Sequence, residues 1–187
     1  GIKWVIGCIE ACMPAAEKCG VKLVIENHYK DGFWTFPEFA QKKDIFLEII
    51  RNIDSPWLGV QYDPSNAIIA GEDPLELLDD VLDRIETVHA SDRFLAPGAS
   101  LEDLERKEEG KGYADILMHG IVGKGINNYE EIFRRLSAAG FDGWISIEDG
   151  MNGIEEMLKS VNYLKLMKEK YFMNSKKLCQ DILTCTK

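Results

Sequence analysis

Four segments of the chain have the pattern of short buried strands, and each ends in a residue type that binds divalent metal ions. Apolar runs of this length, bounded by turn residues and alternating with longer helical patterns, are typical of a parallel α/β sheet. In such sheets, functional side chains gather at the carboxyl ends of the strands, so we expect the four terminal residues to meet at one mouth. The segments span residues 21–26, 58–63, 85–89 and 144–148, and their terminal residues are Glu26, Asp63, His89 and Glu148.

The segments between these strands predict helices and set the order of the fold. Apolar spacing indicates helices near residues 2–18, 36–52, 74–83, 129–139 and 154–170, and a polar stretch covers residues 92–120. The resulting order contains four strand-helix units, which is half of a (β/α)8 TIM barrel of about 250 residues. We therefore predict an α/β fold of TIM-barrel type. Residues 1–170 are expected to form a partial, metal-binding barrel domain, and residues 171–187 a terminal helix or tail.

A sheet of only four parallel strands has two open edges. Proteins normally cover or pair such edges, because their unpaired backbone groups can join another chain. The chain also opens with a helical pattern, whereas a complete barrel opens with a strand. We expect the chain to self-associate or to pair with a missing N-terminal half.

Charge and hydropathy exclude several classes of partner. Lys and Arg number 22 against 32 for Asp and Glu, which gives a formal net charge of −10 and disfavours nucleic acid as the main partner. No apolar run approaches the roughly 20 residues of a membrane span, and the first residues lack the pattern of a signal peptide. The sequence predicts a cytoplasmic protein without a membrane or nucleic-acid partner.

Five cysteines lie near the two ends of the chain. They form no CxxC pair, and no histidine stands at zinc-finger spacing from them. We predict that they are reduced packing residues without a catalytic role. They are Cys8, Cys12, Cys19, Cys179 and Cys185.

Four motifs at the predicted strand ends resemble the xylose isomerase-like TIM-barrel superfamily of sugar isomerases and epimerases. Ile-Glu-Asn-His at 25–28 is similar to the end of the family's fifth strand, and Asp-Pro-Ser-Asn at 63–66 to the sixth. Val-His-Ala-Ser-Asp at 88–92 resembles the seventh strand, and residues 123–148 resemble the final unit. The resemblance covers residues 1–165, lacks the family's first four strands, and has Asn66 where many members have a histidine.

The resemblance implies a metal-dependent proton transfer on a small sugar, sugar phosphate or keto acid. Two substrate oxygens would chelate the ion, and the polarised carbonyl would give an enediolate after proton removal. Glu26 and Glu148 would serve as base and acid. Three carboxylates and one imidazole suit Mn²⁺ best, and Mg²⁺, Co²⁺ or Zn²⁺ are alternatives.

Further site residues are predicted around these ligands. His28 lies two residues after Glu26 and either contacts substrate or is an exposed loop residue. Asn66 is expected to bind substrate, and Arg93 to bind a sugar hydroxyl or phosphate unless it is a surface arginine. Asp92 is predicted to orient the imidazole of the strand-end histidine, as metal-bound imidazoles usually require.

Two other features have both a functional and a structural interpretation. Phe33, Trp34 and Phe36 either cap the apolar face of a sugar ring or anchor the following helix. Gly123-Lys124-Gly125 either binds a phosphate or, more simply, turns the chain into the next helix.

Four functions remain open from the sequence. The first is an isomerase or epimerase, and the second is a dehydratase of a cyclic polyol ketone, which begins with the same proton removal. The third is a phosphodiesterase similar to endonuclease IV, although its zinc cluster needs more than the three histidines present. The last is a half-barrel that binds a ligand without turnover.

Overall fold

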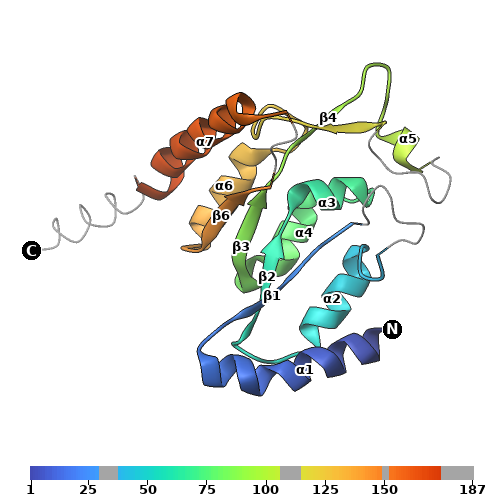
Figure 1. The fold of residues 1–187 in the computed structure, drawn as a ribbon, viewed down its shortest axis with the longest axis vertical. Coiled ribbons are helices and arrows are strands. Elements are labelled where there is room, and N and C mark those ends of the chain that lie inside the picture. The colour runs from blue at the N-terminus through green and yellow to red at the C-terminus, as the bar shows by residue number, and fades with distance from the viewer. Residues whose placement is uncertain (30–37, 106–114, 149–151, 174–187) are drawn as a thin grey trace, which may run out of the picture.

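A computed structural model describes residues 1–29, 38–105, 115–148 and 152–173, and its centre is a four-stranded parallel sheet (Figure 1). The strands lie in the order β1-β2-β3-β6, and each neighbouring pair is parallel. All four predicted strands are confirmed, and the sheet is the partial barrel that the sequence indicated. Their bounds are Leu23–Glu26 for β1, Leu58–Tyr62 for β2, Ile85–Ala90 for β3 and Trp144–Ile147 for β6.

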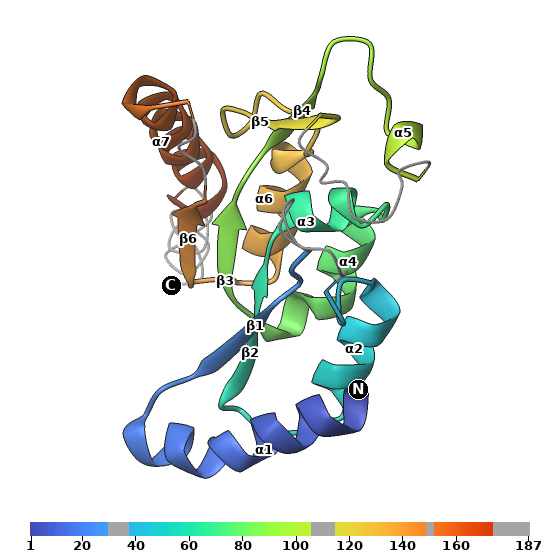
Figure 2. The same ribbon diagram turned by 45° about the vertical axis from the view of Figure 1, so that its right-hand side comes forward.

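The helices alternate with the strands, and α4 and α6 lie along one face of the sheet (Figures 1 and 2). The core forms between this face and the helices, where Tyr62, Val88 and Ala90 pack with Leu78 and Ile132. The alternation along β3 explains the packing, because Val88 and Ala90 face the helices while Thr87 and His89 face the other side. The long helices are α1 (Ile2–Cys19), α2 (Lys43–Arg51), α4 (Pro74–Val81), α6 (Tyr129–Ala138) and α7 (Ile154–Lys168).

Several boundaries differ from the predicted ones. The helix predicted over 36–52 begins at Lys43, and residues 36 and 37 lie outside the described residues. The helix α4 ends at Val81 in a 3₁₀ turn over Leu82–Arg84. The helix predicted over 154–170 ends as α7 at Lys168, and a π-helical turn follows it over Glu169–Met173. Tyr171 and Phe172 explain the extension, since both rings pack on Phe133.

Two further elements were not predicted from the sequence. The short helix α3 (Pro64–Ile69) begins directly after β2, and proline at its first position favours this start. The polar stretch contains an antiparallel pair, β4 (Arg93–Leu95) and β5 (Leu117–His119), together with the short helix α5 (Glu102–Glu105). This hairpin lies beyond the carboxyl end of β3 (Figure 2).

The cysteines of α1 correct one prediction. Cys8, Cys12 and Cys19 are free, as expected, but all three are exposed and therefore do not pack in a core. Cys179 and Cys185 lie outside the described residues. None of the helices in the described part of the chain is long and apolar enough to cross a membrane.

The open edges of the sheet carry exposed apolar side chains. Trp144 on β6 is 77% exposed and Val24 on β1 is 37% exposed. Among the described residues, each of these strands pairs with a single neighbouring strand. Unpaired backbone groups beside apolar side chains are the features that promote pairing with another chain.

We predict that the 187-residue chain self-associates through these edges. Sedimentation velocity should show a species heavier than the 21.2 kDa monomer. Trp144→Lys should shift the population toward monomer, because a charged edge strand resists pairing. Trp4→Lys is the matched control, since Trp4 is 79% exposed but lies on α1. A monodisperse wild-type monomer would contradict the prediction.

Candidate metal centre

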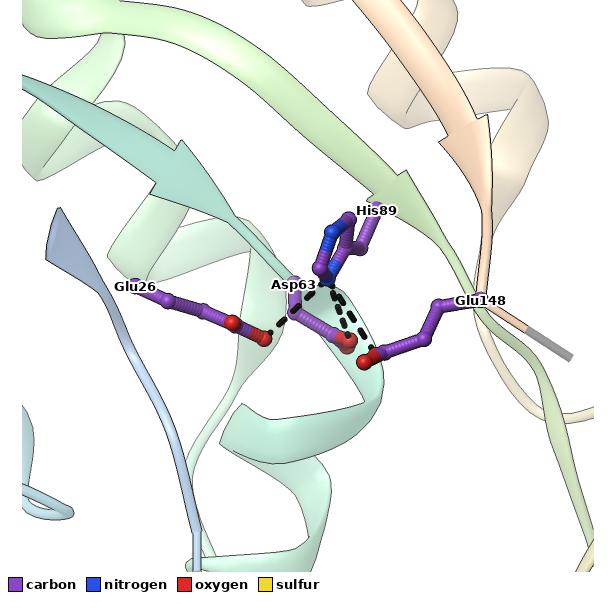
Figure 3. A group of neighbouring side chains, drawn as sticks. All are labelled: Glu26, Asp63, His89 and Glu148. Atoms are coloured by element: carbon purple, nitrogen blue, oxygen red, sulfur yellow. Dashed lines mark hydrogen bonds and ion pairs between the residues drawn. The ribbon is translucent and has the colours of Figure 1, made fainter. Parts of the chain in front are cut away.

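Four side chains from four elements converge at the carboxyl ends of the strands (Figure 3). Glu26 ends β1, Asp63 follows β2, His89 lies near the end of β3 and Glu148 follows β6. One ligand atom from each lies within 4.8 Å of the others. The parallel register produces this convergence, because it brings the carboxyl ends of all four strands to the same end of the sheet. The structure thus brings together the four residues predicted as metal ligands.

Asp63 has one carboxylate oxygen held by the protein and one left for the cluster. It is the N-cap of α3, and its Oδ1 accepts the backbone N–H groups of Ser65 at 2.7 Å and Asn66 at 3.1 Å. The hydroxyl of Ser91 adds a third donor to Oδ1 at 3.3 Å. Oδ2 faces the cluster, 4.0 Å from Nδ1 of His89. The cap therefore leaves a single oxygen for an ion.

Asn27 fixes the main chain of Asp63 against the end of β1. Its Nδ2 donates to the carbonyl of Asp63 at 2.7 Å, and its Oδ1 accepts the N–H of Asp63 at 2.8 Å. The buried side-chain amide thus makes the same pair of hydrogen bonds to Asp63 that the backbone of a neighbouring strand would make. Because Asn27 follows Glu26 directly, the two bonds set the spacing of two ligands. Asn27 was not among the predicted site residues, although it stands inside the motif at 25–28.

Glu26 is held by two side-chain amides. Its Oε1 accepts from Nδ2 of Asn66 at 3.1 Å, and its Oε2 accepts from Nε2 of Gln61 at 3.1 Å. Oε1 also lies 3.2 Å from Nδ1 of His89. Asn66, predicted to bind substrate, therefore lies in the site and contacts a ligand. Gln61 was missed, although a polar residue in an apolar strand is a usable signal.

His89 points Nδ1 at all three carboxylates. Nδ1 lies 3.2 Å from Oε1 of Glu26 and 3.2 Å from Oε2 of Glu148. These hydrogen bonds, that of Glu148 first, raise the pKa of His89 to about 10. Burial raises the pKa of Asp63 to about 8, whereas the bond to His89 lowers the pKa of Glu148. Without a cation, protons thus offset the clustered negative charge.

This donor set fits a hard divalent cation. Three carboxylates and one imidazole nitrogen suit Mn²⁺, Mg²⁺ or Co²⁺ better than a thiolate-preferring ion. An ion among these atoms would replace the protons that otherwise keep the carboxylates together.

Comparison with known proteins identifies the family of the chain. The family model described as xylose isomerase-like TIM barrel matches residues 1–167. The chain belongs to this family. The sequence resemblance to the family is therefore confirmed, and the match ends close to the end of α7.

Relatives within the family include several dehydratases. The chain is 26% identical over 159 residues to the inosose dehydratase of Geobacillus thermodenitrificans, covering 81% of this chain and 49% of that protein. It is 31% identical over 154 residues to an uncharacterised protein of Methanocaldococcus jannaschii, covering 80% and 43%. The chain spans about half the length of the curated relatives it matches.

Solved structures of the family share the fold. A D-tagatose 3-epimerase-like protein matches with a TM-score of 0.65 and 26% identity, over 91% of this chain and 55% of that one. The mannonate dehydratase of Streptococcus suis matches with a TM-score of 0.69 and 16% identity, over 90% and 48%. Each match covers about half of the solved barrel, as expected for a half-barrel.

Asp92 has a different role from the one predicted. Its carboxylate accepts the backbone N–H groups of Gly123 and Gly125 at 2.9 Å each and that of Asn127 at 3.2 Å. It therefore holds the loop before α6, and no hydrogen bond joins it to His89 among the described residues. The same bonds correct the phosphate interpretation of Gly123-Lys124-Gly125, because the N–H groups of both glycines are already taken.

Arg93 and His28 lie near the mouth in contrasting environments. Arg93 is only 5% exposed, so the alternative of a surface arginine is wrong. The side chain of His28 is 47% exposed, and its Nδ1 lies 3.6 Å from Oε1 of Glu38. Substrate binding by either residue stays a prediction. The aromatic residues at 33, 34 and 36 lie outside the described residues.

We predict that Mn²⁺ binds more tightly as the pH rises from about 6 to about 9. Asp63, with a pKa of about 8, and His89, with a pKa of about 10, hold protons in the metal-free protein, and ligation must displace them. Calorimetry in buffers of different ionisation enthalpy should therefore show proton release on binding. Equal affinity across this range without proton release would contradict the assignment of these two ligands.

Proposed function

We propose that this chain is the metal-binding half of a divalent-metal-dependent isomerase or epimerase acting on a small sugar, sugar phosphate or polyhydroxy ketone. The observation that carries the proposal is the convergence of Glu26, Asp63, His89 and Glu148 at the mouth of the sheet. Mn²⁺ is the expected ion. The match to about half of each relative makes the activity of the whole protein part of the proposal.

The two glutamates are suited to proton transfer. They stand on the two edge strands of the sheet, with Asp63 and His89 between them (Figure 3). A divalent ion held there would polarise a substrate carbonyl and acidify the neighbouring C–H bond. Glu26 and Glu148 would then reach the substrate from opposite sides, one removing the proton and the other returning it. Asp63, buried and held by α3, would remain a ligand.

A dehydratase is the second candidate, and the names of the relatives favour it. Inosose dehydratases of several bacteria match the chain at 24–28% identity. Loss of water from a cyclic polyol ketone starts with removal of the proton next to the carbonyl. The same base would then serve, and the acid would protonate the leaving hydroxyl instead of the carbon.

The remaining alternatives have less support. A zinc phosphodiesterase needs several histidines, and the cluster contains one, His89. His119 lies on β5, paired with Arg93 across the hairpin. A half-barrel without turnover would gain nothing from clustered carboxylates, because like charges destabilise a fold unless a cation offsets them.

We predict that Glu148→Gln abolishes tight Mn²⁺ binding or turnover and leaves the fold intact. Glu148 is half exposed and follows directly after β6, so the loss of its charge should leave the thermal midpoint almost unchanged. Metal retained per chain after desalting, measured by mass spectrometry, gives the answer. Glu155→Gln on the exposed surface of α7 is the matched control. Unchanged binding and turnover in Glu148→Gln would refute the assignment.

Proton exchange tests both candidate reactions, and the product that forms distinguishes them. We expect the Mn²⁺-loaded protein, assayed in D₂O, to exchange the proton next to the carbonyl of D-tagatose, L-ribulose or inosose, followed by NMR. A rearranged or epimerised sugar indicates the isomerase, whereas an unsaturated ketone formed with loss of water indicates the dehydratase. Absence of exchange from all three compounds, with metal bound, would contradict both.

A further inference from the structure

A second layer of side chains lies directly beneath the four ligands. Side chains alternate along a strand, so the residue two positions before each ligand shares its face of the sheet. Three of these residues are polar, although the interior of a barrel is usually filled by branched apolar side chains. They are Gln61 before Asp63, Thr87 before His89 and Ser146 before Glu148.

Thr87 determines which way the amide of Gln61 points. Its hydroxyl donates to Oε1 of Gln61 at 3.0 Å. A carbonyl oxygen only accepts hydrogen bonds, so this contact directs Nε2 of Gln61 to the opposite side. On that side Nε2 donates to Oε2 of Glu26 at 3.1 Å and lies 3.4 Å from Nδ1 of His89. One amide therefore contacts two ligands.

We propose that Gln61 and Thr87 are positioning residues of the metal centre, an inference that rests on the proposed metal-dependent function. Gln61 holds Oε2 of Glu26 while Asn66 holds Oε1, and Oε1 faces Nδ1 of His89 at 3.2 Å, where the ligand atoms converge. Thr87 acts through Gln61 by fixing the orientation of its amide. Together they preset the carboxylate that β1 supplies to the ion.

Glu26 needs this support because its side chain is long and flexible. Within the described part of the chain, β1 pairs with β2 alone. Glutamate is long and flexible, and a side chain ordered in advance loses less entropy when it binds an ion. Glu148 on the other edge strand has no amide donor to its carboxylate among the described residues, and its side chain is 52% exposed. The two edge ligands therefore differ in how firmly they are held.

The test compares Mn²⁺ affinities of variants of the 187-residue chain, read from the EPR signal of the free ion. Gln61→Met keeps the length of the side chain without its amide, and Thr87→Val keeps the shape of threonine without its hydroxyl. We expect each to weaken Mn²⁺ binding by about 10-fold or more, the effect usual for partners that orient metal ligands. Thr87→Ser keeps the hydroxyl and should retain wild-type affinity.

Two controls separate positioning from a loss of stability. Ser146→Ala removes a hydroxyl from the same layer that makes no hydrogen bond within the described part of the chain, and its affinity should equal that of wild type. The double variant of Gln61→Met with Thr87→Val should bind like Gln61→Met alone, because Thr87 acts through Gln61. Thermal midpoints measured without metal identify any variant that fails to fold, and the Thr87 pair then supplies the answer independently of Gln61→Met.

The outcomes distinguish this role from the metal centre itself. Wild-type Mn²⁺ binding together with unchanged affinity in Thr87→Val overturns the positioning role and leaves the metal centre standing. Additive losses in the double variant also overturn it, since the two residues would then act separately. No Mn²⁺ binding by the wild-type chain overturns the metal centre and the positioning role together.

Discussion

The parallel register of four strands is the constraint on which the rest of this structure depends. Because all four strands run in one direction, their carboxyl ends lie at the same end of the sheet, together with the residues that follow them. Glu26, Asp63, His89 and Glu148 are far apart in the sequence, yet this register brings them within 4.8 Å of one another. The helices cover one face of the sheet and bury the apolar side chains on it. The side chains on the other face are left for the inside of the barrel.

Clustered negative charge is the second constraint, and the surrounding hydrogen bonds show how the fold accommodates it. Asp63 is capped by the first turn of α3, and Glu26 is held between the amides of Gln61 and Asn66. Asp63 thus has Oδ1 partnered by the protein and Oδ2 directed at His89, whereas Glu26 has an amide on each oxygen and directs Oε1 at His89. A divalent ion would complete this arrangement and replace the protons that offset the charge in its absence.

Much of the fold could be read from the sequence because its strands are short, apolar and clearly bounded. The helix α3 is too short to show a period, and the strands β4 and β5 have three residues each within a polar stretch, so neither element could be predicted from the sequence pattern. Asp92 shows the limit at the site, since its neighbourhood in sequence suggested a bond to His89. In the structure its carboxylate instead accepts hydrogen bonds from the backbone N–H groups of Gly123 and Gly125, which lie more than 30 residues later in the sequence.

The sequence by itself determined the strands, their order and the four residues that end at the mouth, because alternation, length and turn residues are local properties of the chain. Only the tertiary structure decided which groups hold the carboxylates of Glu26 and Asp63, and that Oδ2 of Asp63 faces the cluster. It also decided that Asn27 and Gln61 support the ligands, and that Arg93 is buried. The reason is physical: hydrogen-bond direction and burial depend on how separate strands pack in three dimensions, and no local pattern encodes that packing.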